Sequence, residues 1–167
     1  MNKKGFTLLE LLVVVVIIGI LAAIALPQYK VAAGKAKFAT LKNITKSLKE
    51  SVERYYLVHS SYPKHFNELD IDLVTSLGYA DDNVFSISVD DITCEIWIND
   101  SSMVICRKKI SGELMRYFDY VYPNAGRICE AYSKEEKSTV SRICQAETGK
   151  NINDADCAFS GSCRYSY

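Results

Sequence analysis

The stretch Gly5-Phe6-Thr7-Leu8-Leu9-Glu10 opens an apolar run that continues to Leu26 and decides the fold of this chain. Between Phe6 and Leu26, Glu10 is the one charged residue. The run consists mostly of leucine, valine, isoleucine and alanine, so we expect an α-helix about 31 Å long, enough to cross a membrane's hydrocarbon core. A carboxylate in such a span costs about 2.5–3.5 kcal/mol on insertion scales. The sequence therefore raises the question of which group pairs with Glu10.

The five residues before Phe6 form a short basic leader. This leader has no apolar region of its own, and Lys3 and Lys4 would keep it in the cytoplasm by the positive-inside rule. Gly19 lies inside the apolar run, and Pro27 follows it directly. Because proline lacks an N–H, Pro27 is expected to kink or loosen the turn before it.

This N-terminal pattern closely resembles that of type IV prepilins and pseudopilins, over residues 1 to about 57. The resemblance rests on the basic leader, on Gly5, Phe6 and Thr7, and on Glu10 at the head of an apolar helix. It implies that a prepilin peptidase cleaves between Gly5 and Phe6 and that the new amine of Phe6 is N-methylated. It also implies that Glu10 faces the Phe6 ammonium of a neighbouring subunit. Gly19 and Pro27 fall where the family has helix-loosening residues.

Two other interpretations of the apolar run remain open. Ala23-Ile24-Ala25 has the form of a secretory signal cleavage site, although the run is longer than the usual apolar region and contains Glu10. A plain signal-anchor helix would leave Glu10 unpaired in lipid. The N-terminal residue of the mature protein distinguishes the three interpretations: Phe6, a residue just after Ala25, or Met1.

The remaining length suits one folded domain. The predicted organisation is a leader at 1–5, a transmembrane and assembly helix at 6–27, and a globular head at 28–167. The helix is expected to continue from Phe6 to about Val58, near 80 Å in all. Its second half, 28–58, carries an apolar stripe at helical spacing that Thr45 interrupts. The stripe consists of Val31, Gly34, Phe38, Leu41, Leu48, Val52 and Tyr55.

The net charge is zero, but the charges are unevenly distributed. The helix after Pro27 carries a basic group: Lys30, Lys35, Lys37, Lys42, Lys46 and Lys49. An acidic sector between His65 and Cys106 contains Glu68, Asp70, Asp72, Asp81, Asp82, Asp90, Asp91, Glu95 and Asp100. The basic helix of one subunit could dock on the acidic sector of another, or both could simply be solvated faces. No specific nucleic-acid partner is indicated.

All six cysteines lie beyond the predicted helix, which suggests disulfides in an exported domain. Six cysteines allow 15 connectivities, and we expect the nearest-neighbour pairs Cys94–Cys106, Cys129–Cys144 and Cys157–Cys163. Zinc is the rival interpretation, but the chain has no C-x-x-C pair, and His59 and His65 are remote from the cysteines.

Four stretches are predicted to form strands of an antiparallel sheet against the helix: 84–89, 94–98, 103–108 and 112–118. Turns are expected at 81–83, 90–91 and 99–102, and a helical turn or two within 66–77. The stretches 127–132 and 134–145 suggest short helices. Residues 149–167 are polar and irregular, and resemble the cysteine-bounded region of pilins. The fold class is therefore α+β, a pilin fold with a sheet of about four strands and a disulfide-rich C-terminal region.

The chain contains no Gly-rich phosphate loop, no G-x-S-x-G motif and no H-E-x-x-H motif. It is not expected to be an enzyme or to need a cofactor. No metal site is expected, and Asp154 and Asp156 are a weak calcium candidate at most, with a solvated loop as the simpler explanation.

The resemblance implies a structural prepilin, inserted in the inner membrane by a single pass with its head outside the cytoplasm. A membrane platform and its ATPase would then assemble copies of the chain into an extracellular pilus. A pseudopilin of a type II secretion system and a membrane-anchored binding module that does not polymerise are the alternatives.

Overall fold

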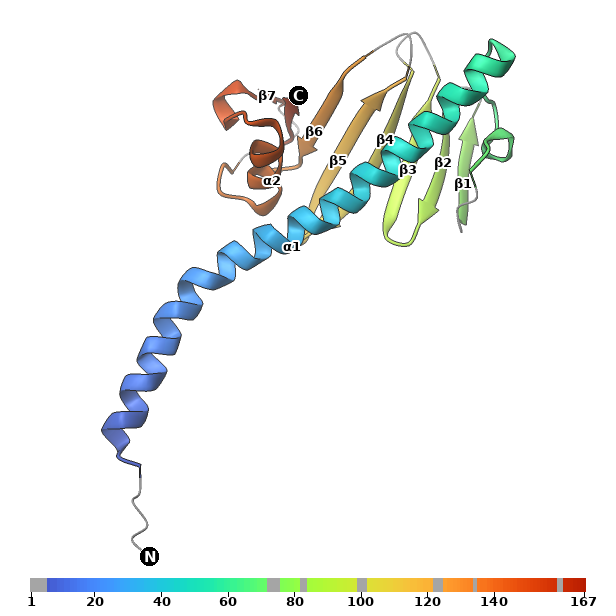
Figure 1. Ribbon diagram of the computed structural model, residues 1–167. Coiled ribbons are helices and arrows are strands. Elements are labelled where there is room, and N and C mark those ends of the chain that lie inside the picture. The colour runs from blue at the N-terminus through green and yellow to red at the C-terminus, as the bar shows by residue number, and fades with distance from the viewer. Residues whose placement is uncertain are drawn as a thin grey trace, which may run out of the picture.

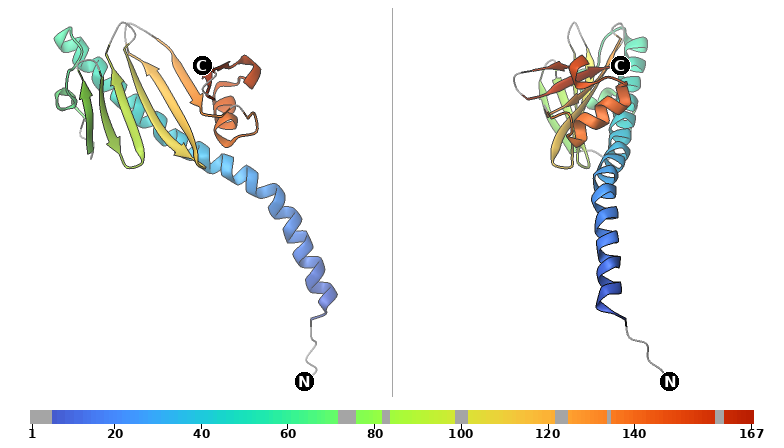
Figure 2. Two further views of the ribbon diagram at one scale, coloured as in Figure 1. Left: turned by 180° about the vertical axis from the view of Figure 1, so that it is seen from behind. Right: turned by 90° about the vertical axis from the view of Figure 1, so that its left-hand side faces the viewer.

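The computed structural model describes residues 6–71, 76–81, 84–98, 102–121, 125–133, 135–158 and 161–167. Helix α1 runs from Leu8 to His59, and its second half crosses one face of an antiparallel sheet, while its first half projects from the head (Figure 1). The eight strands lie in the order β1-β2-β3-β4-β5-β6-β8-β7. Helix α2, Thr139–Thr148, packs on α1 and on β6 at the end of the head nearest the projecting half (Figure 2).

The strands are β1 (Ser76–Asp81), β2 (Val84–Val89), β3 (Ile92–Trp97), β4 (Met103–Ile110), β5 (Glu113–Tyr120), β6 (Arg127–Ala131), β7 (Asp156–Cys157) and β8 (Cys163–Ser166). Two short 3₁₀ helices, Phe66–Glu68 and Ile152–Asp154, complete the elements of the described residues.

The apolar stripe of α1 is confirmed. Phe38, Leu41, Leu48 and Val52 are fully buried, and the Phe38 ring meets the Tyr117 ring edge-on at 5.7 Å. Thr45 does not interrupt this stripe, because its side chain is buried in it. Its hydroxyl donates a hydrogen bond to the Leu41 carbonyl at 2.8 Å, which satisfies the one polar group that the position would otherwise bury unpaired.

The sheet contributes the other side of the core through the alternating positions of its strands. Ile96, Val104 and Met115 are fully or almost fully buried, as expected for one face of an antiparallel sheet. Helix α2 closes the core at one end with Val140 and Ile143. The head therefore has a complete core that uses only the second half of α1.

The expected antiparallel sheet against a long helix is confirmed, but the count of about four strands is wrong. The stretch 127–132, predicted as a helix, forms β6 at 127–131 and pairs with β5, for example Glu130 with Arg116. The tail also joins the sheet, since β8 pairs with β6 and with β7. Periodicity cannot separate helix from strand in runs this short, and pairing with an existing strand edge decides the outcome.

The other local predictions are met in part. The turn at Asp90 and Asp91 is confirmed between β2 and β3. The predicted turns at 81–83 and 99–102 fall partly on residues 82–83 and 99–101, which lie outside the described residues. Within 66–77 the structure has the short 3₁₀ helix and the start of β1, and 72–75 are not described. The helix predicted at 134–145 is α2, which begins at Thr139 after the Ser138 cap.

Gly34 lies where α1 packs against α2 and the end of β4. A Cβ at this position would lie 2.7 Å from Cδ1 of Ile143 and 3.1 Å from Cγ2 of Ile110. Distances this short leave no room for a branched side chain. A glycine at this point of the stripe therefore allows the two helices to approach.

We expect Gly34→Val to lower the free energy of unfolding of the head by about 1–3 kcal/mol, the usual cost of overpacking a core. Gly19→Val is the matched control, because nothing lies within 4 Å of a Cβ at Gly19. Urea unfolding of the detergent-solubilised chain, followed by near-ultraviolet circular dichroism, measures both variants. Equal stability of the two variants would contradict close packing at Gly34.

Candidate functional site

The first half of α1 is an unpaired apolar surface. Phe6 and Leu8 are 80% and 88% exposed, and even Val14 is 45% exposed. Within the described residues, α1 is the helix that is long and apolar enough to cross a membrane, and none of its most apolar stretch is buried in the chain. An apolar surface of this size marks a membrane or protein interaction.

Thr7 and Glu10 form a capping box at the start of α1. The backbone N–H and the hydroxyl of Thr7 donate to Oε2 of Glu10 at 2.9 and 2.7 Å, and the N–H of Glu10 is paired with Oγ1 of Thr7 at 3.2 Å. Thr7 itself has an extended backbone, with φ −82° and ψ 148°. The T-x-x-E spacing is a known signature of this motif, so Thr7 is a functional residue that the sequence signals and that the predicted site did not include.

The capping box answers part of the question about Glu10. Its carboxylate accepts hydrogen bonds from Thr7 of its own chain. A plain signal-anchor helix was expected to leave Glu10 unpaired, and for hydrogen bonds this expectation is wrong. The charge is a separate matter. Both bonds fall on Oε2, and no described residue supplies Glu10 with a cation. A hydrogen-bonded but uncompensated carboxylate therefore stands at the head of the apolar segment.

Gly19 and Pro27 both lie inside α1, which stays helical through them. Figure 1 shows the helix curving between its projecting half and the half on the sheet. Pro27 cannot donate a hydrogen bond to the preceding turn, which makes this part of α1 the easiest to bend. Lys3, Lys4 and Gly5, predicted for the leader and the cleavage site, lie outside the described residues.

Several lysines of α1 pair with carboxylates of the same chain. Lys42 forms an ion pair with Glu147, and Lys49 with the nearly buried Asp119 at 2.8 Å. Lys46 pairs with Glu50 on the exposed side of the helix at 3.7 Å. Because these lysines are paired within one subunit, fewer of them are free to dock on another subunit than the sequence suggested.

Members of the acidic sector are also engaged within the head. Lys108 lies 2.5 Å from Asp91. Arg54 makes two hydrogen bonds to Asp70, at 2.7 and 2.8 Å, and Ser51 donates a third at 2.6 Å. The Arg54 guanidinium, followed by the Ser51 hydroxyl, holds the pKa of the Asp70 carboxyl well below its usual range. Asp70 thus fastens the segment after α1 back onto the helix.

Three disulfides tie the head together, and they join each cysteine to its nearest neighbour in the sequence. Cys94–Cys106 links the paired strands β3 and β4, and Cys157–Cys163 links β7 and β8. Cys129–Cys144 joins β6 to α2. The cysteines of this last pair are fully buried, so this disulfide fixes α2 against the sheet.

We expect removal of Cys129–Cys144, by alanine at both positions, to lower the free energy of unfolding by about 3 kcal/mol, the chain-entropy value for a 15-residue loop. Alanine avoids placing hydroxyls in the core. The matched control removes Cys157–Cys163, whose smaller loop predicts about 2 kcal/mol at the edge of the sheet. Guanidinium unfolding of both variants gives the comparison. A larger loss for Cys157–Cys163 would contradict the role of Cys129–Cys144 at α2.

The two calcium candidates, Asp154 and Asp156, have different roles in the structure. Oδ2 of Asp154 accepts a hydrogen bond from the Asn151 N–H at 3.1 Å and so caps a 3₁₀ helix, while Asp156 lies in β7 opposite Arg164. Among the described residues, no three His, Cys, Asp or Glu side chains gather as metal ligands would.

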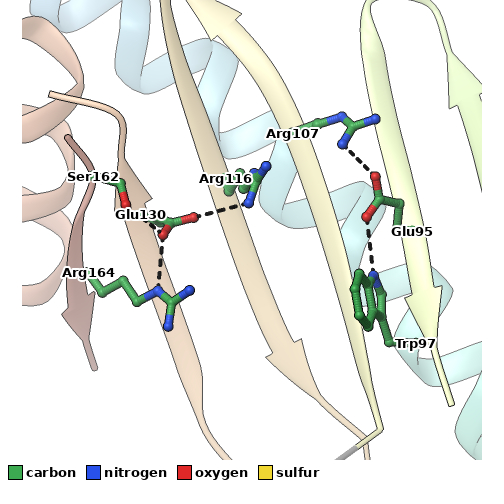
Figure 3. A network of polar contacts seen from close by, with 7 residues as sticks. All are labelled: Glu95, Trp97, Arg107, Arg116, Glu130, Ser162 and Arg164. Atoms are coloured by element: carbon green, nitrogen blue, oxygen red, sulfur yellow. Dashed lines mark hydrogen bonds and ion pairs between the residues drawn. The ribbon is translucent and has the colours of Figure 1, made fainter. Parts of the chain in front are cut away.

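The face of the sheet away from α1 carries a polar network that the sequence patterns did not predict (Figure 3). Glu130 on β6 is buried and accepts hydrogen bonds from Arg164 at 3.0 Å and from Ser162 at 3.2 Å, with Arg116 at 3.6 Å. The hydrogen bond to Glu130 raises the pKa of Arg164 above its ordinary value. Glu130 thereby ties the C-terminal strand to the centre of the sheet.

A second part of this network lies on β3 and β4. Glu95 pairs with Arg107 at 2.5 Å and accepts a hydrogen bond from the Trp97 indole at 3.2 Å (Figure 3). Arg107 and Arg116 lie directly opposite each other on β4 and β5, and each is paired with a carboxylate on its other side. Once 127–132 is assigned to a strand beside β5, Glu130 lies directly opposite Arg116, and this cross-strand charge pair is the signal that would have predicted this row.

Comparison with known proteins gives matches over both the N-terminus and the head. Residues 1–26 match the family described as "Prokaryotic N-terminal methylation motif". The type IV major pilin protein PilE of Neisseria gonorrhoeae is 26% identical over 152 residues, which are 91% of this chain and 80% of that protein. A fimbrial protein of Neisseria meningitidis serogroup B is 33% identical over 111 residues, 65% of this chain and 64% of that protein.

A shorter match is to a protein of a secretion system. The type II secretion system core protein G of Pseudomonas aeruginosa is 41% identical over 62 residues, 37% of this chain and 44% of that protein. No solved structure matches significantly.

These similarities agree with the geometry. The methylation motif covers the segment that the structure shows as a projecting apolar half-helix, and the longest of these matches extends across the head. The head in turn combines that helix with an antiparallel sheet and three disulfides. Together, the methylation motif, the similarity to pilins and to a secretion core protein, and the fold support the type IV pilin and pseudopilin family for this chain.

Proposed function

We propose that this chain is a prepilin, a membrane-anchored precursor that is cleaved, N-methylated and polymerised into a type IV pilus. The observation that carries the proposal is the first half of α1, which is apolar and exposed on all sides, joined to a head whose core is already complete. Such a half-helix must lie in lipid or against copies of itself. A precursor in the inner membrane uses the first environment, and a filament uses the second.

The processing steps follow from the N-terminus. Lys3 and Lys4 hold the leader, residues 1–5, in the cytoplasm, and the head lies outside, where its disulfides form in an oxidising compartment. A prepilin peptidase removes the leader between Gly5 and Phe6, and the Phe6 amine is N-methylated. A cytoplasmic ATPase and a membrane platform then lift subunits from the bilayer. The chain acts as a building block and not as an enzyme, and no step needs a cofactor of its own.

Assembly moves the segment 6–27 from lipid into a bundle of identical helices. This exchange is nearly neutral for apolar burial, because lipid is as apolar as the bundle. The polar groups therefore select the register. Glu10 has its hydrogen bonds from Thr7 but no cation among the described residues, and the Phe6 ammonium of a neighbouring subunit supplies one. Gly19 and Pro27 allow the helix to adapt its curvature to the bundle, while the head at 28–167 moves as a unit.

Electron microscopy of material sheared from cells that express the chain tests the proposal. We expect long filaments that contain this protein with Phe6 as its first residue. A deletion strain provides the comparison, because it should lose these filaments while it still exports its enzymes. Loss of an exported enzyme without any loss of filaments would identify a secretion pseudopilin instead. A protein that stays monomeric in the membrane would contradict polymerisation altogether.

A further inference from the structure

An open groove of about 400 Å³ lies between α1 and the C-terminal end of α2. Val31 and Lys35 of α1 form one wall, and Arg142 and Gln145 of α2 form the other, with Lys150 just beyond the helix end. The volume is in the range of small-ligand sites. Three cations thus line one groove, and no Asp or Glu is among the described residues that line it.

The cations of this groove are not paired with carboxylates as Lys42 and Lys49 of α1 are. Lys42 and Lys49 are paired with carboxylates, whereas Lys35 and Arg142 make no ion pair with any described residue. Lys150 donates to the hydroxyl of Ser166 at 2.8 Å, which is not a carboxylate. The buried amide Nε2 of Gln145 also has no hydrogen-bond partner in the described part of the chain. The groove therefore offers three positive charges to an anion.

The position of the groove along α1 indicates where that anion would come from. The apolar segment ends at Leu26, so Val31 lies about 7 Å and Lys35 about 13 Å further along the helix at 1.5 Å per residue. The headgroup layer of a bilayer extends roughly 5–7 Å beyond the hydrocarbon core on each side. Figure 2 shows α2 at the end of the head that faces the projecting half of α1. Lysine and arginine side chains reach back toward a membrane surface from such positions.

We propose that this groove binds the headgroup of an anionic phospholipid in the membrane-anchored precursor. The phosphate diester lies between Lys35 and Arg142, with Lys150 at its side, and the acyl chains run down along the exposed apolar half of α1. Val31 contributes the apolar wall where headgroup and acyl chain meet. The contact holds the head at a fixed height above the outer surface of the inner membrane, and it is broken when the subunit enters a filament. The proposal uses the proposed function only in taking 6–26 as a membrane anchor.

A titration of the full-length, unassembled chain in dodecyl maltoside tests this site. The probe is dihexanoyl-phosphatidylglycerol, and the readout is the backbone amide NMR shifts of residues that line the groove. Dihexanoyl-phosphatidylcholine and inorganic phosphate, at the same ionic strength, are the comparison ligands. We expect phosphatidylglycerol to shift Lys35 and Gln145 in a saturable way, phosphatidylcholine to shift neither, and phosphate to bind more weakly than the lipid.

Two double variants complete the design. Lys35→Gln with Arg142→Gln should weaken phosphatidylglycerol binding roughly thirtyfold, since each cation near an anionic membrane surface contributes about fivefold. Lys46→Gln with Lys109→Gln removes the same charge from exposed positions outside the groove and should retain the wild-type affinity. Amide spectra of the rest of the head show that both variants are folded.

Three results of the titration would overturn the proposal: equal binding of the two lipids, binding of inorganic phosphate as tight as that of phosphatidylglycerol, or equal affinities in the two double variants. A reduced filament yield from the groove variant with unchanged lipid binding would assign the groove to contact with a second subunit and would also overturn it. Because the titration uses unassembled protein, its outcome is independent of whether the chain forms filaments.

Discussion

We expect that replacing Glu10 with glutamine will leave membrane insertion and removal of the leader intact but will abolish filaments or reduce them severely. Glutamine is also a residue of capping boxes, so it can accept the hydrogen bond from Thr7 and keep the start of α1 in place. What the variant loses is the negative charge. The observed role of Glu10 as a helix cap and its proposed role as partner of the Phe6 ammonium can therefore be tested separately.

The expected size of the effect follows from the cost of a wrong register. A subunit at the wrong height leaves a carboxylate without its cation in apolar surroundings, at about 2.5–3.5 kcal/mol on insertion scales. This penalty corresponds to about two orders of magnitude in population. Without the charge, correctly and wrongly placed subunits differ little, because the remaining contacts resemble those in lipid.

Thr7→Val is the matched control, because it removes the hydroxyl of the cap and keeps the charge of Glu10. We expect this variant to form filaments. Loss of the cap should lower the stability of the first turn of α1 by about 1 kcal/mol. Filaments are measured by electron microscopy and immunoblot of sheared material, and membrane-bound protein by its intact mass. Normal filaments from Glu10→Gln would contradict the charge role. A defect in Thr7→Val as severe as that in Glu10→Gln would show that Glu10 acts through the cap.

Gly5→Glu should block removal of the leader and, as a result, all filament formation. Phe6 and Thr7 lie before the first turn of α1, and Thr7 has an extended backbone. The bond proposed for cleavage therefore precedes the helix, where a peptidase can bind the chain in an extended form. Glutamate at position 5 would add bulk and a negative charge next to the scissile bond, at the membrane surface. Both changes oppose binding in a site that accepts glycine.

Intact-mass measurement of the membrane-bound protein checks this result, because the proposed cleavage would remove residues 1–5 and the proposed methylation would add one methyl group at Phe6. Gly5→Ala is the control, since it adds a single methyl group and no charge, and we expect it to retain cleavage. The Glu10→Gln variant should be cleaved normally, which separates a processing defect from an assembly defect. Mature protein from Gly5→Glu would contradict the proposed cleavage site.

The helix was predictable from sequence because its signals are long and independent of context. The apolar stripe from Val31 to Tyr55 repeats over several turns, and its burial is confirmed along with the helix end near His59. The strand β2 was predicted from period-two alternation at 84–89, and β3 and β4 from a hairpin pattern around 99–102. The helix prediction for 127–132 failed because a segment this short takes its conformation from its neighbours. In this case the open edge of β5 and the link from Cys129 to α2 decide the conformation.

The candidate site was predictable in identity but not in geometry. The motif named Phe6 and Glu10, yet the hydrogen bonds from Thr7 appear only when the turn is built. The network around Glu130 depends on which strands become neighbours, and Ser162 and Arg164 are far from Glu130 in sequence. The count of charges also suggested that the lysines of α1 are free. In the structure, Lys42 and Lys49 form ion pairs within their own chain.

One continuous helix joins the apolar tip to the far end of the head, from Leu8 to His59. A pulling force on a filament would therefore load this single rod, while the sheet is carried beside it with its disulfides unstressed. The turn before Pro27 lacks a backbone hydrogen bond and would lengthen first. The fibre could thus yield under tension at its centre and recover without any unfolding of its heads.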